Sequence, residues 1–176
     1  MTSDTATEDL VADIASRLGS RRLACAESCT GGLLAQMFAK ATGSIDWFPG
    51  GIVTYQKDAK VALLGLEPGP VVTHAAARAM AAGAAKLFGC EVAVSITCAA
   101  GPDPLDGVAP GTIFVGTFVD GEARSHLHRI RGSVDIVCRS ARDYALRDLM
   151  VDLTASRPAP STSTSTSTER AVPCRP

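Results

Sequence analysis

From residue 23 to residue 34 the chain reads Leu23-Ala24-Cys25-Ala26-Glu27-Ser28-Cys29-Thr30-Gly31-Gly32-Leu33-Leu34. Residues 22–26 form a short and mostly apolar run, which is typical of a buried strand. From Leu33 to Ala41, apolar residues recur at helical spacing. The stretch therefore predicts a strand, a tight turn and a helix, and we interpret the rest of the chain outward from it.

The predicted turn carries hydroxyl groups and two glycines. Thr30 is suited to cap the helix by accepting N–H groups of its first turn. Gly31 and Gly32 remove Cβ atoms where a ligand would approach the backbone. A helix start carries partial positive charge and unpaired N–H donors. Ser28 therefore lies where a nucleophile or a phosphate contact would be useful.

The remaining periodicity alternates helices with strands. It predicts helices over 10–18, 58–64, 73–88 and 133–149, and strands over 52–55, 92–97, 112–119 and 123–130. Asp120-Gly121 is a strong hairpin signal between the last two strands. This order predicts an α/β sandwich with a mixed sheet and helices on both faces. A site is expected at the carboxyl ends of the parallel strands, where the Ser28 turn would meet the strand ends at Tyr55 and Thr97.

Composition excludes several classes of protein. The chain has 176 residues, of which 46% are hydrophobic and 20% charged, and its net charge is −1. These values are typical of one globular domain with a real core. Lys and Arg are dispersed, so no nucleic-acid footprint is visible, and no apolar run is long enough to span a bilayer. The polar, acidic first ten residues are unlike a secretory signal. We expect a cytoplasmic protein that binds neither nucleic acid nor membrane.

Cysteines and histidines give no clear metal motif. In a cytoplasmic chain, the six cysteines favour reduced, buried thiols. Cys25 and Cys29 lack a second Cys/His pair at zinc spacing, so we predict no metal site. His126 and His128 share one strand face, for which we expect an exposed edge rather than a chelating pair.

The chain divides into three parts. Residues 1–8 are expected to be a flexible N-terminus and residues 9–154 the folded domain. Residues 155–176 are rich in Ser, Thr and Pro and cannot bury a core, so we expect a disordered tail.

The motifs resemble those of the CinA C-terminal domain family. The resemblance runs over nearly all of residues 8–153 and rests on Ala26-Glu27-Ser28-Cys29-Thr30-Gly31-Gly32, Gly50-Gly51-Ile52-Val53-Thr54-Tyr55, Lys60, Leu64-Gly65-Leu66, Met80-Ala81-Ala82-Gly83, Thr97, Ala100-Gly101-Pro102 and Gly111-Thr112. The seven-residue signature, followed at fixed distances by the tyrosine and the lysine, makes the match specific.

The resemblance implies both a fold and a reaction. The fold is a three-layer α/β/α sandwich with a mixed, mostly parallel five-stranded sheet, similar to anticodon-binding domains. The family includes nicotinamide-nucleotide amidases, which hydrolyse the carboxamide of nicotinamide mononucleotide to nicotinate mononucleotide and ammonia without a metal. The resemblance thus implies a hydrolase with a small pyridine nucleotide as substrate and no cofactor. Small α/β domains of this kind often form homodimers, for which Trp47-Phe48-Pro49 is our candidate contact.

An amidase of this kind needs a nucleophile, a base and a stabiliser of the oxyanion. We predict Ser28 as nucleophile and Lys60 as base, provided that burial or a neighbouring cation lowers the pKa of the lysine. Tyr55 would relay a proton or hold the other two in line, and Lys57 is the alternative base. Backbone N–H groups near residues 30–32 would hold the oxyanion or a ligand phosphate. Substrate contacts are predicted for Glu27, Thr30, Gly31, Gly32, Gly51, Thr97 and Gly101.

Each of these side chains also has an ordinary structural interpretation. Ser28 would cap a helix, Tyr55 would be a core aromatic, and Lys60 would be a solvated surface charge. Glu27 would be a loop carboxylate in water.

Three loops depart from the family pattern. Cys98-Ala99 replaces the usual Gly-Ile, Val108-Ala109 lacks the usual lysine, and Ser133-Val134 replaces Asp-Arg. These changes motivate two alternatives, namely a nucleotide-binding module without turnover and an amidase acting on another small carboxamide. A thiol redox or metal protein built on Cys25 and Cys29 is a further alternative, which predicts a disulfide or a bound metal.

Overall fold

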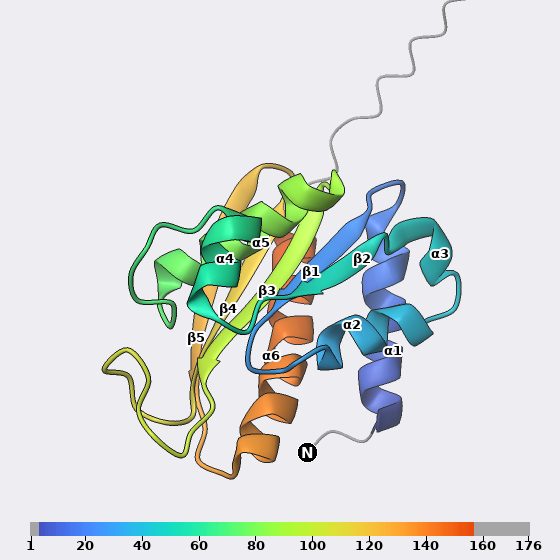
Figure 1. The fold of residues 1–176 in the computed structure, drawn as a ribbon. Helices are drawn as coiled ribbons and strands as arrows, with labels where there is room; N and C mark the ends of the chain where they lie inside the picture. Colours follow the sequence, from blue (N-terminus) through green and yellow to red (C-terminus); the bar gives the residue numbers. More distant parts are fainter. Residues whose placement is uncertain (1–3, 157–176) are drawn as a thin grey trace, which may run out of the picture.

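The computed structural model describes residues 4–156, so residues 1–3 and the expected tail over 157–176 lie outside the described residues. The helices are α1 (Asp4–Leu18), α2 (Leu33–Lys40), α3 (Ser44–Trp47), α4 (Lys57–Leu64), α5 (His74–Phe88) and α6 (Val134–Ala155), and the strands are β1 (Leu23–Glu27), β2 (Gly50–Val53), β3 (Val92–Ala99), β4 (Thr112–Val119) and β5 (Glu122–Arg129) (Figure 1).

One mixed sheet forms the centre of the domain. Its strand order is β2-β1-β3-β4-β5. The β1 strand pairs parallel with β2 and β3, whereas β4 pairs antiparallel with both β3 and β5. Only β4 therefore runs against the common direction, which confirms the predicted mixed five-stranded sheet. The Asp120-Gly121 hairpin is also confirmed, with both residues at positive φ (51° and 95°), as this tight turn requires.

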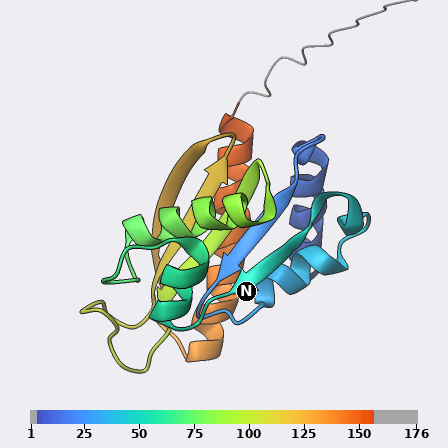
Figure 2. The same ribbon diagram turned by 45° about the horizontal axis from the view of Figure 1, so that its top comes forward.

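Helices cover both faces of the sheet (Figures 1 and 2). The α1, α2 and α6 helices enclose a large core on one face, where β3 contributes Val92, Val94 and Ile96. The α4 and α5 helices enclose a second core on the other face around Met80 and Leu64. Because side chains alternate across a strand, the central strands supply both cores. This arrangement is the predicted α/β/α sandwich.

The α5 helix lies unusually close to the sheet because small residues face each other there. A Cβ added at Gly116 of β4 would lie 2.1 Å from the carbonyl oxygen of Ala77, so only glycine fits. The hydroxyl of Ser95 donates to the same carbonyl at 2.7 Å. This close packing fixes α5 over β3 and β4, and with it the loop at residues 71–72 that precedes the helix.

Several element boundaries differ from the sequence-based expectations. The α1 helix begins at Asp4, so residues 4–8 are its first turns rather than part of a flexible terminus. Thr7 is buried there, which explains why the helix starts early. The α6 helix extends to Ala155, one residue into the expected tail. The β2 strand ends at Val53, which leaves Thr54 and Tyr55 to lead into α4.

Aromatic side chains near α3 pack inward. Trp47 is buried, and its ring lies 6.0 Å from those of Phe38 and Phe48. These rings pack in or against the larger core, so Trp47 already has partners within the domain, and the dimer contact stays a prediction. No helix within residues 4–156 is long and apolar enough to span a bilayer.

The β5 strand is joined to α6 by charged side chains. Nε2 of His126 lies 2.8 Å from Asp152, and Nε2 of His128 lies 2.7 Å from Asp148. Burial by itself raises the pKa of Asp152, but hydrogen bonds from Thr117 and His126 outweigh it and hold this pKa below its usual value. The β5 strand is an edge of the sheet, as expected, but both histidines are half-buried because they contact α6.

Candidate active site

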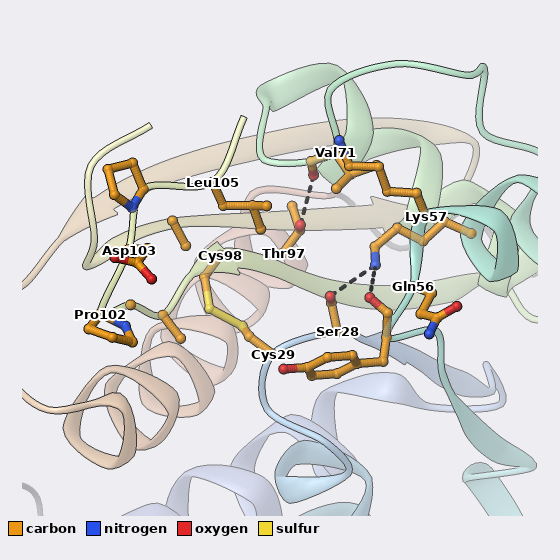
Figure 3. Close-up of a pocket in the computed structure, with 16 residues that line it drawn as sticks. Ser28, Cys29, Gln56, Lys57, Val71, Thr97, Cys98, Pro102, Asp103 and Leu105 are labelled. Atoms are coloured by element: carbon orange, nitrogen blue, oxygen red, sulfur yellow. Dashed lines mark hydrogen bonds between the residues drawn. A yellow bond between two sulfur atoms is a disulfide. The ribbon is translucent and has the colours of Figure 1, made fainter. Parts of the chain in front are cut away.

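A cavity of about 440 Å³ opens at the carboxyl ends of β1 and β3 (Figure 3). Ser28, Tyr55 and Thr97 all line it, as the sequence predicted for these three chain segments. Lys60 from α4 and the loop over residues 99–105 complete the wall. The cavity size is typical of a small-molecule site.

The turn that presents Ser28 is held by a buried carboxylate. Glu27 is fully buried, and its oxygens accept hydrogen bonds from the N–H groups of Gly32, Leu34 and Ala35 at 3.1, 3.1 and 2.8 Å. A negative charge at a helix start is favourable because it meets unpaired N–H groups and the positive end of the helix dipole. The predicted ligand-binding role of Glu27 is thus corrected, since its carboxylate caps α2.

Thr30 does not cap the helix. Its hydroxyl is buried and has no hydrogen-bond partner among the described residues, while Glu27 occupies the N–H groups it would have met. The N–H of Gly31 donates to the carbonyl of Ser28 at 3.2 Å. Within residues 4–156, the N–H groups of Cys29 and Thr30 make no hydrogen bond, so they are the free donors of this turn.

Three predicted glycines serve the backbone rather than the cavity. Gly31 and Gly32 have φ of 60° and 110°, the left-handed region that glycine adopts without steric cost. Neither lines the cavity. A Cβ on Gly51 would lie 2.4 Å from Sγ of Cys25, so this glycine allows β2 to pack beside β1. The predicted substrate contacts at these positions are corrected, because the tight turn and the strand packing account for them.

Ser28 and Lys60 meet at the floor of the cavity. Nζ of Lys60 donates to Oγ of Ser28 at 2.9 Å, and to the carbonyls of Thr54 and Tyr55 at 2.6 and 3.0 Å. An ammonium group has three N–H donors, which these acceptors satisfy. A neutral amine has two, so the two carbonyls can hold its protons while its lone pair faces the serine hydroxyl. The geometry suits a nucleophile beside a base.

Burial sets the basicity of the lysine amine. Lys60 is only 1% exposed, and this loss of solvation lowers its pKa from 10.5 to about 8. The carboxylate of Asp106 opposes the shift, and the nearby cation of Lys57 adds to it. A substantial fraction of the amine is therefore neutral near physiological pH, which a surface lysine does not achieve.

Tyr55 and Lys57 lie at the cavity mouth in roles other than those predicted. The Tyr55 side chain is 73% exposed, and its carbonyl, not its hydroxyl, contacts Lys60. A proton relay through its phenol is not formed here, because Tyr55 follows the end of β2 and turns outward. Lys57 forms an ion pair with Asp106 and makes no hydrogen bond to Ser28 within the described residues, so Lys60 and not Lys57 is the lysine in contact with the serine.

The opposite wall combines predicted and unpredicted contacts. The buried hydroxyl of Thr97 donates to the carbonyl of Val71 at 2.7 Å, so it supports the wall, and its proton is not free for a ligand (Figure 3). Gly101 does line the cavity. Asp106, which the sequence analysis missed, anchors this wall through the N–H of Val71 at 2.6 Å. The sequence does contain a signal for this turn, the Asp106-Gly107 dipeptide, which is the same type of turn pair as Asp120-Gly121.

A disulfide joins Cys29 to Cys98 at the cavity rim (Figure 3). The expectation of reduced thiols is wrong for this pair, although Cys25, Cys90 and Cys138 are free. The register explains it: Glu27 pairs with Ile96 in the parallel ladder, and each cysteine lies two residues further along the chain, Cys29 in the turn after β1 and Cys98 near the end of β3. The alternative interpretation placed a disulfide or a metal at Cys25 and Cys29, whereas Cys29 is bonded to Cys98. No group of three or more His, Cys, Asp or Glu side chains within residues 4–156 could hold a metal ion.

The family model of the CinA C-terminal domain matches residues 5–153, which is most of the chain. The chain belongs to the CinA C-terminal domain family. Among curated relatives, the CinA-like protein of Mycobacterium avium is 48% identical over 100 residues, 54% of this chain and 22% of the relative. A putative competence-damage inducible protein of Bacillus velezensis is 35% identical over 127 residues, 69% of this chain and 30% of the relative. The chain therefore spans less than a third of the length of these relatives.

Solved structures of CinA superfamily proteins share the fold at nearly full length. The protein from Escherichia coli is 28% identical and superposes with a TM-score of 0.80, over 88% of this chain and 94% of that one. The protein from Klebsiella pneumoniae gives the same identity and TM-score, over 85% and 99%. The α/β/α architecture is thus that of CinA superfamily domains.

Proposed function

We propose that this CinA-family domain is an amidohydrolase in which Ser28 is the nucleophile and Lys60 the general base. The single observation that carries the proposal is the 2.9 Å contact between Oγ of Ser28 and Nζ of Lys60 inside a cavity. The lowered pKa of Lys60, caused chiefly by burial, supplies the neutral amine that a base requires. The resemblance to nicotinamide-nucleotide amidases supplies the reaction class, hydrolysis of a carboxamide.

The proposed reaction needs only groups that the chain provides. Neutral Lys60 takes the proton of Ser28 while Oγ forms a bond to the amide carbon. The carbonyl electron pair moves onto oxygen, close to the free N–H of Cys29, the residue after the nucleophile. The tetrahedral species then loses its amine, which receives the proton from the Lys60 ammonium and departs as ammonia. A water molecule then gives a proton to the neutral Lys60 amine and bonds to the acyl carbon. The bond from Oγ of Ser28 to that carbon breaks, and the Lys60 ammonium returns the proton to Oγ, which releases the carboxylic acid.

Nicotinamide mononucleotide is the proposed substrate. The exposed ring of Tyr55 at the cavity mouth offers a surface on which a pyridine ring can stack. A second candidate, a small carboxamide without a phosphate, is favoured by one observation. The cavity's only basic lining residues, within the described part of the chain, are Lys57 and Lys60, and both are already engaged by other groups.

The test measures ammonia release by the purified protein. We expect conversion of nicotinamide mononucleotide to its acid, and a comparison with nicotinamide and aliphatic carboxamides separates the two candidate substrates. Faster turnover of the phosphate-free amides would favour the second candidate. Calorimetric binding of the nucleotide without any conversion would instead identify a binding module and overturn the amidase proposal.

The rate of hydrolysis should rise with pH through the titration of Lys60. Because the base acts only when neutral, and its pKa is about 8, kcat/KM should fall about tenfold per pH unit below that value and level off above it. The measurement is a pH–rate profile from pH 6 to 10 at low substrate concentration. A flat profile between pH 6 and 9 would contradict the assignment of Lys60 as base.

A further inference from the structure

The carboxylate of Asp106 lies at the centre of a network that no catalytic assignment uses. Leu105 and Val108 exchange backbone hydrogen bonds of 3.1 and 2.9 Å, which makes Asp106-Gly107 the tip of a tight turn. Both tip residues have positive φ, 54° and 74°, as a two-residue turn of this type requires. Asp106 therefore holds a backbone conformation that is rare outside glycine, asparagine and aspartate.

This turn directs the Asp106 carboxylate into the protein. Its side chain is only 7% exposed. One oxygen accepts the N–H groups of Val71 and Val72 at 2.6 and 3.3 Å. The other oxygen forms an ion pair with Nζ of Lys57. Because Thr97 holds the carbonyl of Val71 from the other side, the segment at residues 71–72 is fixed from two directions.

Lys57 connects this network to the candidate base. Lys57 and Lys60 are three residues apart on α4 and therefore share one face of the helix. Both line the cavity. The Lys57–Asp106 ion pair thus lies beside the amine that contacts Ser28.

We propose that Asp106 is a positioning residue, and that its ion pair with Lys57 sets the charge state of the Lys60 amine. The part of this proposal that concerns catalysis rests on the proposed function. The carboxylate favours the ammonium form of Lys60, and the Lys57 cation favours the neutral form. Burial is the largest influence on the Lys60 amine, and the two paired charges act on it in opposite directions, so removal of either charge should change its charge state.

Other charged or titratable groups near Lys60 do not take this role. Glu27, at the end of β1, is occupied by the N–H groups of α2. Asp103 lines the cavity but makes no hydrogen bond or ion pair within the described residues. Tyr55 contributes its carbonyl to Lys60. Asp58 is exposed on α4 and makes no ion pair within residues 4–156.

The experiment titrates Lys60 directly, without substrate. Protein carrying ¹³C-labelled lysine is followed by NMR over pH 6 to 11, and the Lys60 signal is assigned by its loss in Lys60→Met. In Asp106→Asn, the remaining Lys57 cation should move the Lys60 titration down by about 0.5 to 1 pH unit. In Lys57→Met, the remaining carboxylate should move it up by a similar amount. The double variant should titrate near the unsubstituted protein, and the control Asp58→Asn should not move it.

The same variants are then assayed for amide hydrolysis. The acid limb of kcat/KM should follow the NMR titration, so that at pH 7 Asp106→Asn has roughly three to five times more neutral base than the unsubstituted protein. Shifts of the same sign in both single variants, or no shift in either, would overturn the inference. If the two single variants shift the Lys60 titration in opposite directions but the protein hydrolyses no amide, the effect of the ion pair on Lys60 would stand and only the proposed function would be refuted.

Discussion

Replacement of Ser28 by alanine is expected to lower the rate of amide hydrolysis at least about 10³-fold, because it removes the atom that bonds to the substrate carbon. The expected residual rate comes from the remaining binding groups. Lys60 keeps its two backbone acceptors, Thr54 and Tyr55, so the domain should stay folded. Turnover of nicotinamide mononucleotide, measured by ammonia release, tests this directly.

The matched control is Ser44→Ala. The hydroxyl of Ser44 donates to the carbonyl of Ala39 in the last turn of α2, and Ser44 does not belong to the cavity lining. This variant should retain full activity, and circular dichroism should show both variants folded. Hydrolysis by Ser28→Ala at the unsubstituted rate would show that water or another group attacks the amide, and would remove the central assignment.

Loss of the disulfide between Cys29 and Cys98 should have the largest effect on stability. The bond closes a loop with a sequence separation of 69 residues, and a crosslink of this span lowers the entropy of the unfolded chain by an amount equivalent to about 4 kcal/mol. Cys98→Ser should therefore lower the free energy of unfolding by about that amount. The measurement is urea unfolding with and without a thiol reductant.

The control for the disulfide is Cys90→Ser. Cys90 is a free thiol, so this variant should still lose stability when reductant is added, whereas Cys98→Ser should not respond. Peptide mapping without reduction should find the peptides of Cys29 and Cys98 linked. Free thiols at both positions in protein purified without reductant, or identical unfolding midpoints with and without it, would show that the bond is absent in solution.

The sequence predicted those parts of the fold that depend on local pattern. The alternation of Val92, Val94 and Ile96 identified β3, and the Asp120-Gly121 pair identified the hairpin. The α3 helix was missed because four residues carry too little periodicity. The early start of α1 was missed because its first turns are polar, and the tertiary burial of Thr7 leaves no signal in the local sequence.

The site was predicted less completely because it depends on strand register. Ser28 was selected by its place in the predicted turn, but Lys60 was selected only with the family resemblance, and no local pattern brings the two together across 32 positions of sequence. The disulfide was missed because pairing Cys29 with Cys98 requires knowing that β1 and β3 are neighbours. The sequence analysis predicted that Thr30 caps α2, whereas Glu27 does so in the structure. The side chain of Glu27 reaches the helix from the preceding strand, and no fixed sequence spacing marks a cap of this kind.

The capping of α2 by Glu27 bears on how the nucleophile is prepared. Because the helix start obtains its counter-charge from the chain itself, the turn at Ser28 is ordered before any ligand arrives. The free-energy cost of ordering that turn arises when the protein folds. It therefore does not weaken the binding of a small molecule. Pre-organisation of this kind means that the unliganded protein already holds the Ser28 hydroxyl in the orientation that the proposed reaction requires.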